Sequence, residues 1–418
     1  MEVAEDEGDD VPKIPSLFTE LPNEIIWFQI LPKLPAKSLM RFKCVSKAWF
    51  ALITRNPSFL SAYRNLHSNR NTSLLLLDLR NIDTKQQHIM SLHINQDGSP
   101  SPAGATHLLT LEPQEYSLPN VLCTNGLACF IFMHEHRIRV FNPCTRESIT
   151  LPSTSNSPTS YQSTSPDVKP WGAEIGYGFG FSPTTDEYMV VQLELCRFLH
   201  QEPANFYRVD ASINLQVFTL GSAEPWRRVV VEHDDLPFDH TFWRIDMKSV
   251  CLHGAIHWTH DEEKCVVVYD LGEQRFRVIP FPPEFDGNSH HFWAIVDVGG
   301  CLALTYDKET TSTSYLAGLE LWILKDYQDQ VWVKEVFAVT YSLHSFTTYP
   351  YSCLCAIHTG EILIESGALS QAFLHFYDMK NQSFRESSIV VPEWLCRKDA
   401  NIRWDVISCY DETIAPVK

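Results

Sequence analysis

The sequence lacks the features of a secreted or membrane-inserted chain. Its first ten residues, MEVAEDEGDD, contain neither the basic start nor the apolar stretch of a signal peptide. No segment approaches the roughly 18 consecutive apolar residues of a membrane-spanning helix. The ending TIAPVK carries no prenylation signal. We therefore expect a protein of the cytoplasm, the nucleus or both, with no membrane partner.

Positive charge is also scarce. The 418 residues include 51 acidic and only 33 basic side chains, and the formal net charge is -18. A chain with this balance is repelled by nucleic-acid phosphates and by anionic lipid surfaces. We therefore expect no nucleic acid among its partners.

Catalytic and metal-binding motifs are absent from the sequence. It contains no P-loop, no G-x-S-x-G, no H-E-x-x-H and no C-x-x-C. Gly176, Gly178 and Gly180 in GYGFGF lack nucleotide-binding spacing, so we interpret them as strand glycines packed beneath aromatic rings. His253 and His257 are four residues apart in a strand-like segment, which does not predict a metal site. We expect no catalytic residue, no metal and no cofactor.

The 12 cysteines are spread along the chain rather than gathered in a motif. Without a secretory route, thiols stay reduced and behave as small apolar residues. We therefore expect these cysteines to be reduced and mostly buried.

A compact basic block stands near the start of this acidic chain. Between Ile30 and Asn65 there are seven basic residues and no Asp or Glu. Apolar residues recur at helical spacing in IIWFQILPKLP, AKSLMRFKCV and KAWFALITR, which prolines and the N-cap Ser46 separate. The block therefore predicts three short helices, a further turn after Pro57, and more apolar surface than so small a module can bury.

From Leu74 onward the apolar residues follow a two-residue period instead. Strand-like runs such as SLLLLDL, LACFIF, YMVVQLEL and CVVVYDL follow one another to about residue 393, with turn residues at short intervals. This pattern predicts an all-β sandwich, barrel or propeller.

An internal repeat favours the propeller. Its unit is an apolar strand ending in an aromatic residue, a polar turn and then Trp or Phe, as in VYDLGEQRF and FYDMKNQSF. Successive units are 77, 51, 53 and 55 residues apart, which suits blades of about four strands in some 50 residues. Five clear units and a degenerate N-terminal unit predict about six blades. An incomplete ring, closed by pairing of the N-terminal strand with the last blade, is an alternative. The leading aromatic residues are Phe141, Phe218, Tyr269, Trp322 and Tyr377.

The predicted organisation is α+β and multidomain. Residues 1–15 are expected to form a disordered acidic tail, 17–65 the helical module, 74–395 the β-domain and 396–418 a C-terminal tail. Residues 152–170, rich in Ser, Thr and Pro, are expected to be a flexible surface loop within the β-domain.

The helical block closely resembles the F-box of plant proteins. Its first helix is one residue longer than the common form, with Trp27-Phe28 where an aliphatic and an acidic residue are usual. Further along, VFNPCTRE, GYGFGFSPTTDEYMVV, VCLHGAIHWT and LELWILKDY resemble the F-box-associated region of the same family. The residues that match the F-box pattern are Leu21-Pro22, Leu34-Pro35, Lys37-Ser38-Leu39, Arg41-Phe42-Lys43-Cys44-Val45-Ser46-Lys47, Trp49 and Leu52-Ile53.

This resemblance implies a substrate receptor of an SCF-type (Skp–cullin–F-box) ubiquitin ligase. The F-box would bind a Skp-type adaptor, and through it a cullin and a RING subunit. The propeller would hold the target protein for ubiquitination and degradation, and the receptor itself would make no bonds. The target and the residues that bind it stay unknown. The expected adaptor-binding residues are Leu21, Pro22, Ile25, Leu31, Leu34, Pro35, Leu39, Phe42, Val45 and Trp49.

Three other functions are compatible with the sequence. The chain could be an adaptor-binding scaffold without a ligase role, or its propeller could bind a small molecule or a glycan. A propeller hydrolase would need converging carboxylates or a metal at the central channel, and no repeated acidic motif supplies them.

Overall fold

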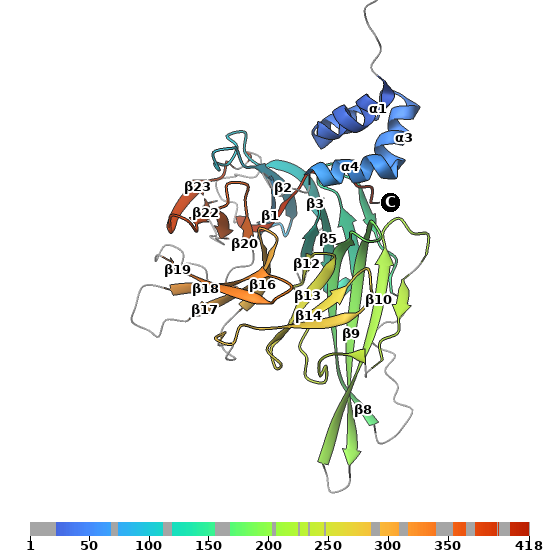
Figure 1. Cartoon of the computed structure of the whole chain (residues 1–418), viewed down its shortest axis with the longest axis vertical. Helices are drawn as coiled ribbons and strands as arrows, with labels where there is room; N and C mark the ends of the chain where they lie inside the picture. The colour runs from blue at the N-terminus through green and yellow to red at the C-terminus, as the bar shows by residue number, and fades with distance from the viewer. Residues whose placement is uncertain are drawn as a thin grey trace, which may run out of the picture.

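A helical module followed by a ring of six β-sheets makes up the chain (Figure 1). The fold class predicted from the sequence is thereby confirmed. The predicted acidic tail, Leu21 and most of the Ser/Thr/Pro-rich loop lie outside the described residues. The computed structural model describes residues 22–67, 74–111, 119–154, 168–202, 206–224, 226–232, 235–245, 248–285, 293–308, 317–339, 354–364, 373–390, 392 and 402–417.

Prolines set the limits of the helices. Pro22 and Pro35 precede α1 and α2, and Pro57 begins α4. Ser46 Oγ accepts the backbone N–H of Trp49 at 3.2 Å and so caps α3. The sequence predicted only a turn after Pro57, but an eleven-residue helix forms there. The helices are α1 (Asn23–Ile25), the π-helical η1 (Ile26–Ile30), the 3₁₀-helical η2 (Leu31–Lys33), α2 (Ala36–Phe42), α3 (Lys47–Arg55), α4 (Pro57–His67) and, in the β-domain, η3 (Met133–Glu135).

A π-helical turn accommodates the extra residue of the first helix. In η1 the backbone N–H of Leu31 donates to the carbonyl of Ile26, five residues earlier instead of four. Such a turn holds one residue more than an α-helical turn. The insertion noted near Trp27-Phe28 is therefore absorbed within η1. In the described part of the chain, no helix is both long and apolar enough to cross a membrane.

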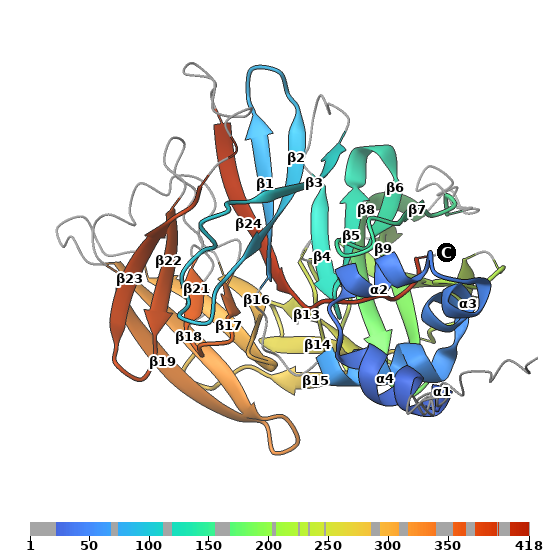
Figure 2. The ribbon, with the colours of Figure 1, turned by 90° about the horizontal axis from the view of Figure 1, so that it is seen from above.

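The strands form six antiparallel sheets of four strands, which we number blades 1 to 6 (Figures 1 and 2). Blades 2 to 6 take consecutive strands from β4 to β23, whereas blade 1 has the order β24-β1-β2-β3. The strands are β1 (Leu74–Asn81), β2 (Gln87–His93), β3 (Thr106–Leu111), β4 (Asn120–Thr124), β5 (Leu127–Phe132), β6 (Arg137–Phe141), β7 (Ser148–Thr150), β8 (Val168–Ser182), β9 (Glu187–Glu202), β10 (Phe206–Thr219), β11 (Arg227–Val229), β12 (Val250–Leu252), β13 (Ala255–His260), β14 (Cys265–Asp270), β15 (Phe276–Pro280), β16 (Trp293–Val298), β17 (Cys301–Lys308), β18 (Ala317–Asp326), β19 (Val331–Val339), β20 (Leu354–Ala356), β21 (Ile362–Ile364), β22 (Phe373–Asp378), β23 (Ser383–Ser388) and β24 (Ile402–Tyr410).

The C-terminal end of the chain closes the ring. β24 pairs with β1 from Leu74 opposite Tyr410 to Asn81 opposite Ile402, and it contacts the innermost strands of blades 6 and 2, β20 and β4. The prediction of a C-terminal tail over residues 396–418 is therefore wrong. The run IRWDVISCY is a strand whose backbone groups pair with those of β1.

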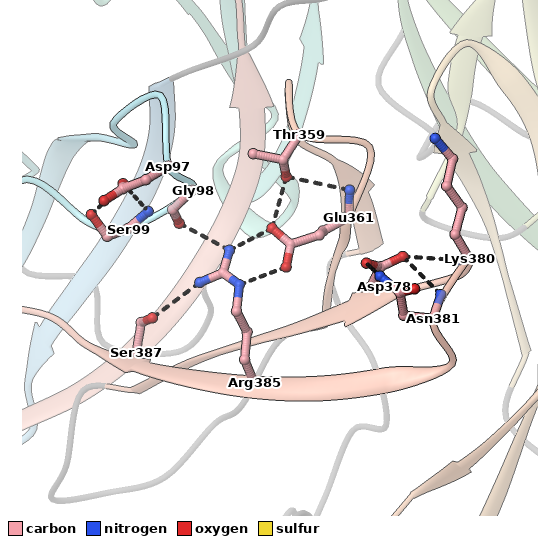
Figure 3. A network of polar contacts seen from close by, with 10 residues as sticks. All are labelled: Asp97, Gly98, Ser99, Thr359, Glu361, Asp378, Lys380, Asn381, Arg385 and Ser387. Carbon is pink, nitrogen blue, oxygen red and sulfur yellow. Dashed lines mark hydrogen bonds and ion pairs between the residues drawn. The ribbon is translucent and has the colours of Figure 1, made fainter.

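A disulfide and an ionic network join blades 6 and 1 at this seam. Cys355 on β20 and Cys409 on β24 form a disulfide, so the expectation of reduced cysteines is wrong for this pair. The guanidinium of Arg385 donates to the Glu361 carboxylate at 2.6 Å and to the carbonyl of Gly98, in the β2–β3 loop, at 3.0 Å (Figure 3). Hydrogen bonds from Arg385 hold the pKa of Glu361 below its usual range.

One turn geometry follows the third strand of four blades in the described part of the chain and explains the repeat in the sequence; it also occurs at Asn81, between β1 and β2 of blade 1. An Asp or Asn at the end of the third strand accepts backbone N–H groups two and three residues later, at 2.8–3.2 Å. In blade 4 the rings of Tyr269 and Phe276 then meet across the turn, with centroids 5.0 Å apart. These contacts are local, so each hairpin is specified by its own residues. The turns begin at Asn142, Asp270, Asp326 and Asp378, and each has a positive φ four residues later, at Arg146, Gln274, Gln330 and Gln382.

The apolar core of the propeller is divided among the junctions between blades. Six clusters of buried side chains occupy the six junctions in the described part of the ring. Two outer tryptophans add polar links, because Trp226 and Trp332 donate their indole N–H groups to the carbonyls of Pro152 and Pro280 in the preceding blade, at 2.8 and 3.1 Å. Each blade therefore depends on both of its neighbours.

Blade 3 extends beyond the ring. Its strands β8, β9 and β10 are 15, 16 and 14 residues long, and together they project as an arm on the side opposite the helices (Figure 1). Trp171 on β8 and Tyr207 on β10 are more than half exposed. The arm thus places large aromatic side chains far from the helical module.

The glycines of GYGFGF let blade 4 approach blade 3 closely. A Cβ at Gly178 would lie 2.6 Å from Cδ1 of Ile256, and one at Gly176 would clash with Ile245. Gly180 is similarly crowded. Real side chains do not tolerate such contacts in a close-packed interior. The segment is therefore a packing motif on an inner strand, although its closest neighbours are mainly aliphatic rather than aromatic.

Gly178→Val is expected to destabilise the propeller by about 1–3 kcal/mol, because buried side chains of blade 4 must shift to admit the new atoms. Gly172→Val on the same strand is the matched control, since no atom lies within 4 Å of a Cβ built at that position. It should change stability by less than about 0.5 kcal/mol. Thermal unfolding of the full-length variants measures both, and equal midpoints would contradict the packing explanation.

Candidate functional site

The helical module is seated on one rim of the propeller, over blades 2 and 3 (Figure 2). From α4, Arg64 forms an ion pair with Asp186 in the β8–β9 turn and lies over the ring of Phe181, 4.3 Å from its centroid. Lys43, after α2, pairs with Glu147 in the β6–β7 turn at 3.4 Å. Two of the seven basic residues of the block therefore pair with carboxylates of the propeller.

The other five basic residues of the block are exposed to solvent. They give the module a positive surface on a chain whose formal net charge is -18. Such a surface attracts and orients an acidic partner. These residues are Lys33, Lys37, Arg41, Lys47 and Arg55.

Two of the expected adaptor-binding residues lie inside the module. Leu31 and Leu39 are 2% and 0% exposed, and they share a cluster with Ile53 of α3 and Phe59 of α4. Side chains this deeply buried cannot contact a partner while the module is folded. The structure assigns them to the packing of the helices, which explains their apolar character without a partner.

Four other expected residues are only partly buried, and three of them, Leu34, Phe42 and Trp49, pack against the core of the module. Ile25, Leu34, Phe42 and Trp49 are half-buried. The rings of Phe42 and Trp49 meet edge to face with centroids 5.4 Å apart, which connects the end of α2 to the start of α3. These side chains stabilise the module and also leave part of their surface open.

The remaining expected residues are on the surface. Pro22 and Pro35 are exposed, and Val45, in the turn between α2 and α3, is 64% exposed. No neighbour within the described chain explains a valine in that position. An apolar side chain held in water at a turn is available for contact with a partner.

Sequence reasoning missed three exposed apolar residues of the same module. Phe28, Ile30 and Phe50 are 41%, 40% and 42% exposed. Phe28 was visible in the sequence as a departure from the usual F-box pattern. In α3, Trp49 is half-buried and Leu52 and Ile53 are buried, whereas Phe50 between them is exposed. Only the folded structure shows this difference in exposure. The exposed apolar residues of the module before α4 thus include Pro22, Phe28, Ile30, Pro35, Val45 and Phe50, and Leu66 is exposed at the end of α4.

The paired histidines belong to the junction between blades 4 and 5. His257 is buried; its Nδ1 lies 3.1 Å from the carbonyl of Val250, and its Nε2 lies 2.6 Å from the hydroxyl of Tyr327. Arg277 donates to the same hydroxyl at 2.7 Å. Burial lowers the pKa of His257 to about 3, so it stays neutral. Across the described residues, no group of three or more His, Cys, Asp or Glu side chains could hold a metal ion.

A small helical module seated on a six-bladed propeller, with apolar and basic residues facing solvent, defines an F-box protein with a propeller domain. Residues 18–61 match the F-box domain, and residues 75–403 match the F-box associated beta propeller domain. The chain therefore belongs to the family of F-box proteins with an F-box-associated β-propeller. An F-box domain implies binding to a Skp-type adaptor.

Relatives in Arabidopsis thaliana share this organisation. One protein named as an F-box protein is 27% identical over 365 residues, which cover 86% of this chain and 82% of its own. An F-box/kelch-repeat protein is 24% identical over 441 residues, covering 94% and 89% of the two chains.

Solved structures resemble the chain only weakly. A chain from a nidogen/laminin complex covers 80% of this chain and 100% of its own, with a TM-score of 0.37 and 10% identity. AztD from Citrobacter koseri covers 81% and 99%, with a TM-score of 0.29 and 9% identity.

His257→Gln is expected to flatten the pH dependence of stability below about pH 6.5. The pKa of His257 is about 3 in the folded chain and 6.5 as an ordinary value, so the unfolded chain binds a proton first as the pH falls. Wild type should then lose about 1.4 kcal/mol of unfolding free energy per pH unit from this group. Denaturant unfolding at about pH 7.5, 6.5 and 5.5 measures the difference.

The control for this experiment is His134→Gln, which alters an exposed histidine on η3. It should keep the wild-type dependence on pH. If His257→Gln kept that dependence as well, the buried neutral histidine would not be a source of acid sensitivity.

Proposed function

We propose that this protein is the substrate receptor of an SCF-type ubiquitin ligase. Its F-box binds a Skp-type adaptor, and through it a cullin and a RING subunit, while its propeller binds the protein to be ubiquitinated. One observation carries this proposal. The F-box is attached to the propeller through α4 and the end of α2, and large apolar residues of its other segments stay exposed, with Val45 64% exposed.

The exposed residues have the chemistry of a protein interface. Large apolar and aromatic side chains at the centre of an interface carry most of its binding energy, about 2 kcal/mol or more for each dominant residue. The same module also exposes five basic residues. Charge of this kind increases the association rate and fixes the orientation of an acidic adaptor.

In this role the receptor makes and breaks no bonds. It contributes proximity, since a target held on the propeller presents its lysines to the conjugating enzyme at a high effective concentration. Families of this kind typically serve as non-catalytic subunits. The propeller is suited to the task because its turns and loops can vary while the blades keep their packing.

Val45→Asp and Phe50→Asp are each expected to weaken binding to a purified Skp-type adaptor about 10- to 30-fold, which corresponds to about 1.4–2 kcal/mol. Both side chains are exposed in the free protein, so folding should be preserved. Leu66→Asp is the matched control, because Leu66 is 50% exposed at the end of α4. Calorimetric titration of the adaptor into each full-length variant gives the affinities.

Two results would count against the proposal. One is a wild-type protein that does not bind the adaptor at all. The other is a Leu66→Asp variant that loses as much affinity as Val45→Asp, since the effect would then reflect added charge rather than a specific contact.

A further inference from the structure

The last residues of the chain lie between the F-box and the propeller. They continue directly from β24, and the side-chain amide of Asn142 in blade 2 donates to the carbonyls of Thr413 and Ala415 at 3.2 and 2.9 Å. A Cβ at Gly126, in the β4–β5 turn, would lie 2.7 Å from Cγ2 of Thr413. The segment is therefore laid directly on blade 2. We name residues 411–417 the strap.

One set of strap side chains is directed to the F-box. The carboxylate of Glu412 accepts the backbone N–H of Ala36, the first residue of α2, at 2.9 Å and the hydroxyl of Tyr63 at 3.5 Å. Burial and the nearby Glu412 raise the pKa of Tyr63, so the phenol stays protonated and can donate. Ile414 is 4% exposed and belongs to the F-box core. Among the buried residues described in that core, it alone comes from outside the module.

A second set of strap side chains faces the propeller. Ala415 and Val417 are 5% and 1% exposed and belong to the apolar cluster between blades 2 and 3. Successive side chains of an extended segment point to opposite sides, so a single strand can serve two surfaces. The strap therefore contributes to the core of each module at the same time.

The two ion pairs described between the modules are weaker in kind. The Lys43–Glu147 and Arg64–Asp186 ion pairs each include a carboxylate with 29% or 47% of its side chain exposed. Ion pairs open to solvent contribute little to stability. Buried apolar contact and a carboxylate that accepts two hydrogen bonds contribute more. Cys144 of blade 2 packs, partly buried, against the F-box core, and Arg64 lies over the ring of Phe181. The strap adds to these contacts a buried apolar side chain and a carboxylate that accepts two hydrogen bonds from the F-box.

We propose that the strap fixes the F-box to the propeller in one orientation, with Glu412 and Ile414 as positioning residues for ubiquitin transfer. The role in transfer rests on the proposed receptor function, whereas the seating of the F-box does not. A fixed orientation sets the distance from a target on the propeller to the ligase bound at the F-box. It therefore selects which lysines reach the conjugating enzyme.

Zero-length cross-linking with a carbodiimide tests this seating in the full-length protein. The reagent joins an amine to a carboxylate in direct contact, so a cross-link between Lys43 and Glu147, 3.4 Å apart, reports that the F-box is seated. The Lys334–Glu320 pair within blade 5, at 2.9 Å, is an internal control for the integrity of the ring. Mass spectrometry gives the ratio of the two yields.

The variants are chosen at Glu412 and Ile414, whose side chains face the F-box, while the side chains that alternate with them face the propeller. Ile414→Asp, or a chain that ends after Glu412, should lower the ratio at least about fivefold, and Glu412→Gln about twofold. Ile414→Val and a chain that lacks only Lys418 should keep the wild-type ratio. An unchanged ratio in the chain that ends after Glu412 would overturn the proposal. Loss of both cross-links would also overturn it, because the segment would then be part of the ring itself.

A reconstituted ligase tests the positioning role. Ile414→Asp should bind the adaptor within about threefold of wild-type affinity, yet spread ubiquitin over more lysines of the receptor's own propeller, and Ile414→Val should restore the wild-type pattern. An unchanged pattern in Ile414→Asp would overturn the positioning role. Failure of the wild type to bind the adaptor would overturn the receptor function and leave the cross-linking result standing.

Discussion

Pairing of β24 with β1 is the contact on which the rest of the structure depends. The core of the propeller lies at six junctions, so a blade is stable only when it has a neighbour on each side. Without β24, blade 1 would lack its innermost strand, and two junctions would open. The disulfide and the Arg385 network occupy this seam, where they join groups as far as 287 positions apart in the chain. Such long loops are entropically costly to close, and stabilising contacts therefore matter most here.

The same closure places the F-box relative to the arm of blade 3. β24 ends at Tyr410, beside blade 2, and the chain then runs under the F-box. Along this path the strap packs against the propeller with one set of side chains and against the F-box with the other. The exposed residues around Val45 and Phe50 face solvent, while the arm of blade 3 projects on the opposite side of the ring. In the proposed receptor role, this separation would let an adaptor and a target bind without excluding each other.

The basic residues of the F-box also fall into two groups, one that contacts the propeller and one that faces solvent. An acidic chain carries a basic module, and the structure divides the basic residues of that module into two groups. Arg64 and Lys43 meet carboxylates of the propeller, and five others remain in solvent. The acidic propeller thus provides an internal partner for part of the positive charge. The positive charge left over is of the kind that attracts an acidic partner.

The sequence by itself determined the features that depend on short-range chemistry: helices limited by Pro35 and Pro57, and hairpins built around Asp270 and Asp378. These features carried the prediction of a small helical module followed by about six blades, and the resemblance to the motif of plant proteins identified that module as an F-box. Tertiary structure alone decided that the predicted C-terminal tail is a strand and a strap, that Cys355 meets Cys409, and which apolar residues of the F-box are buried. Strand pairing, disulfides and burial depend on what lies opposite a residue in space, and its neighbours in sequence do not carry that information.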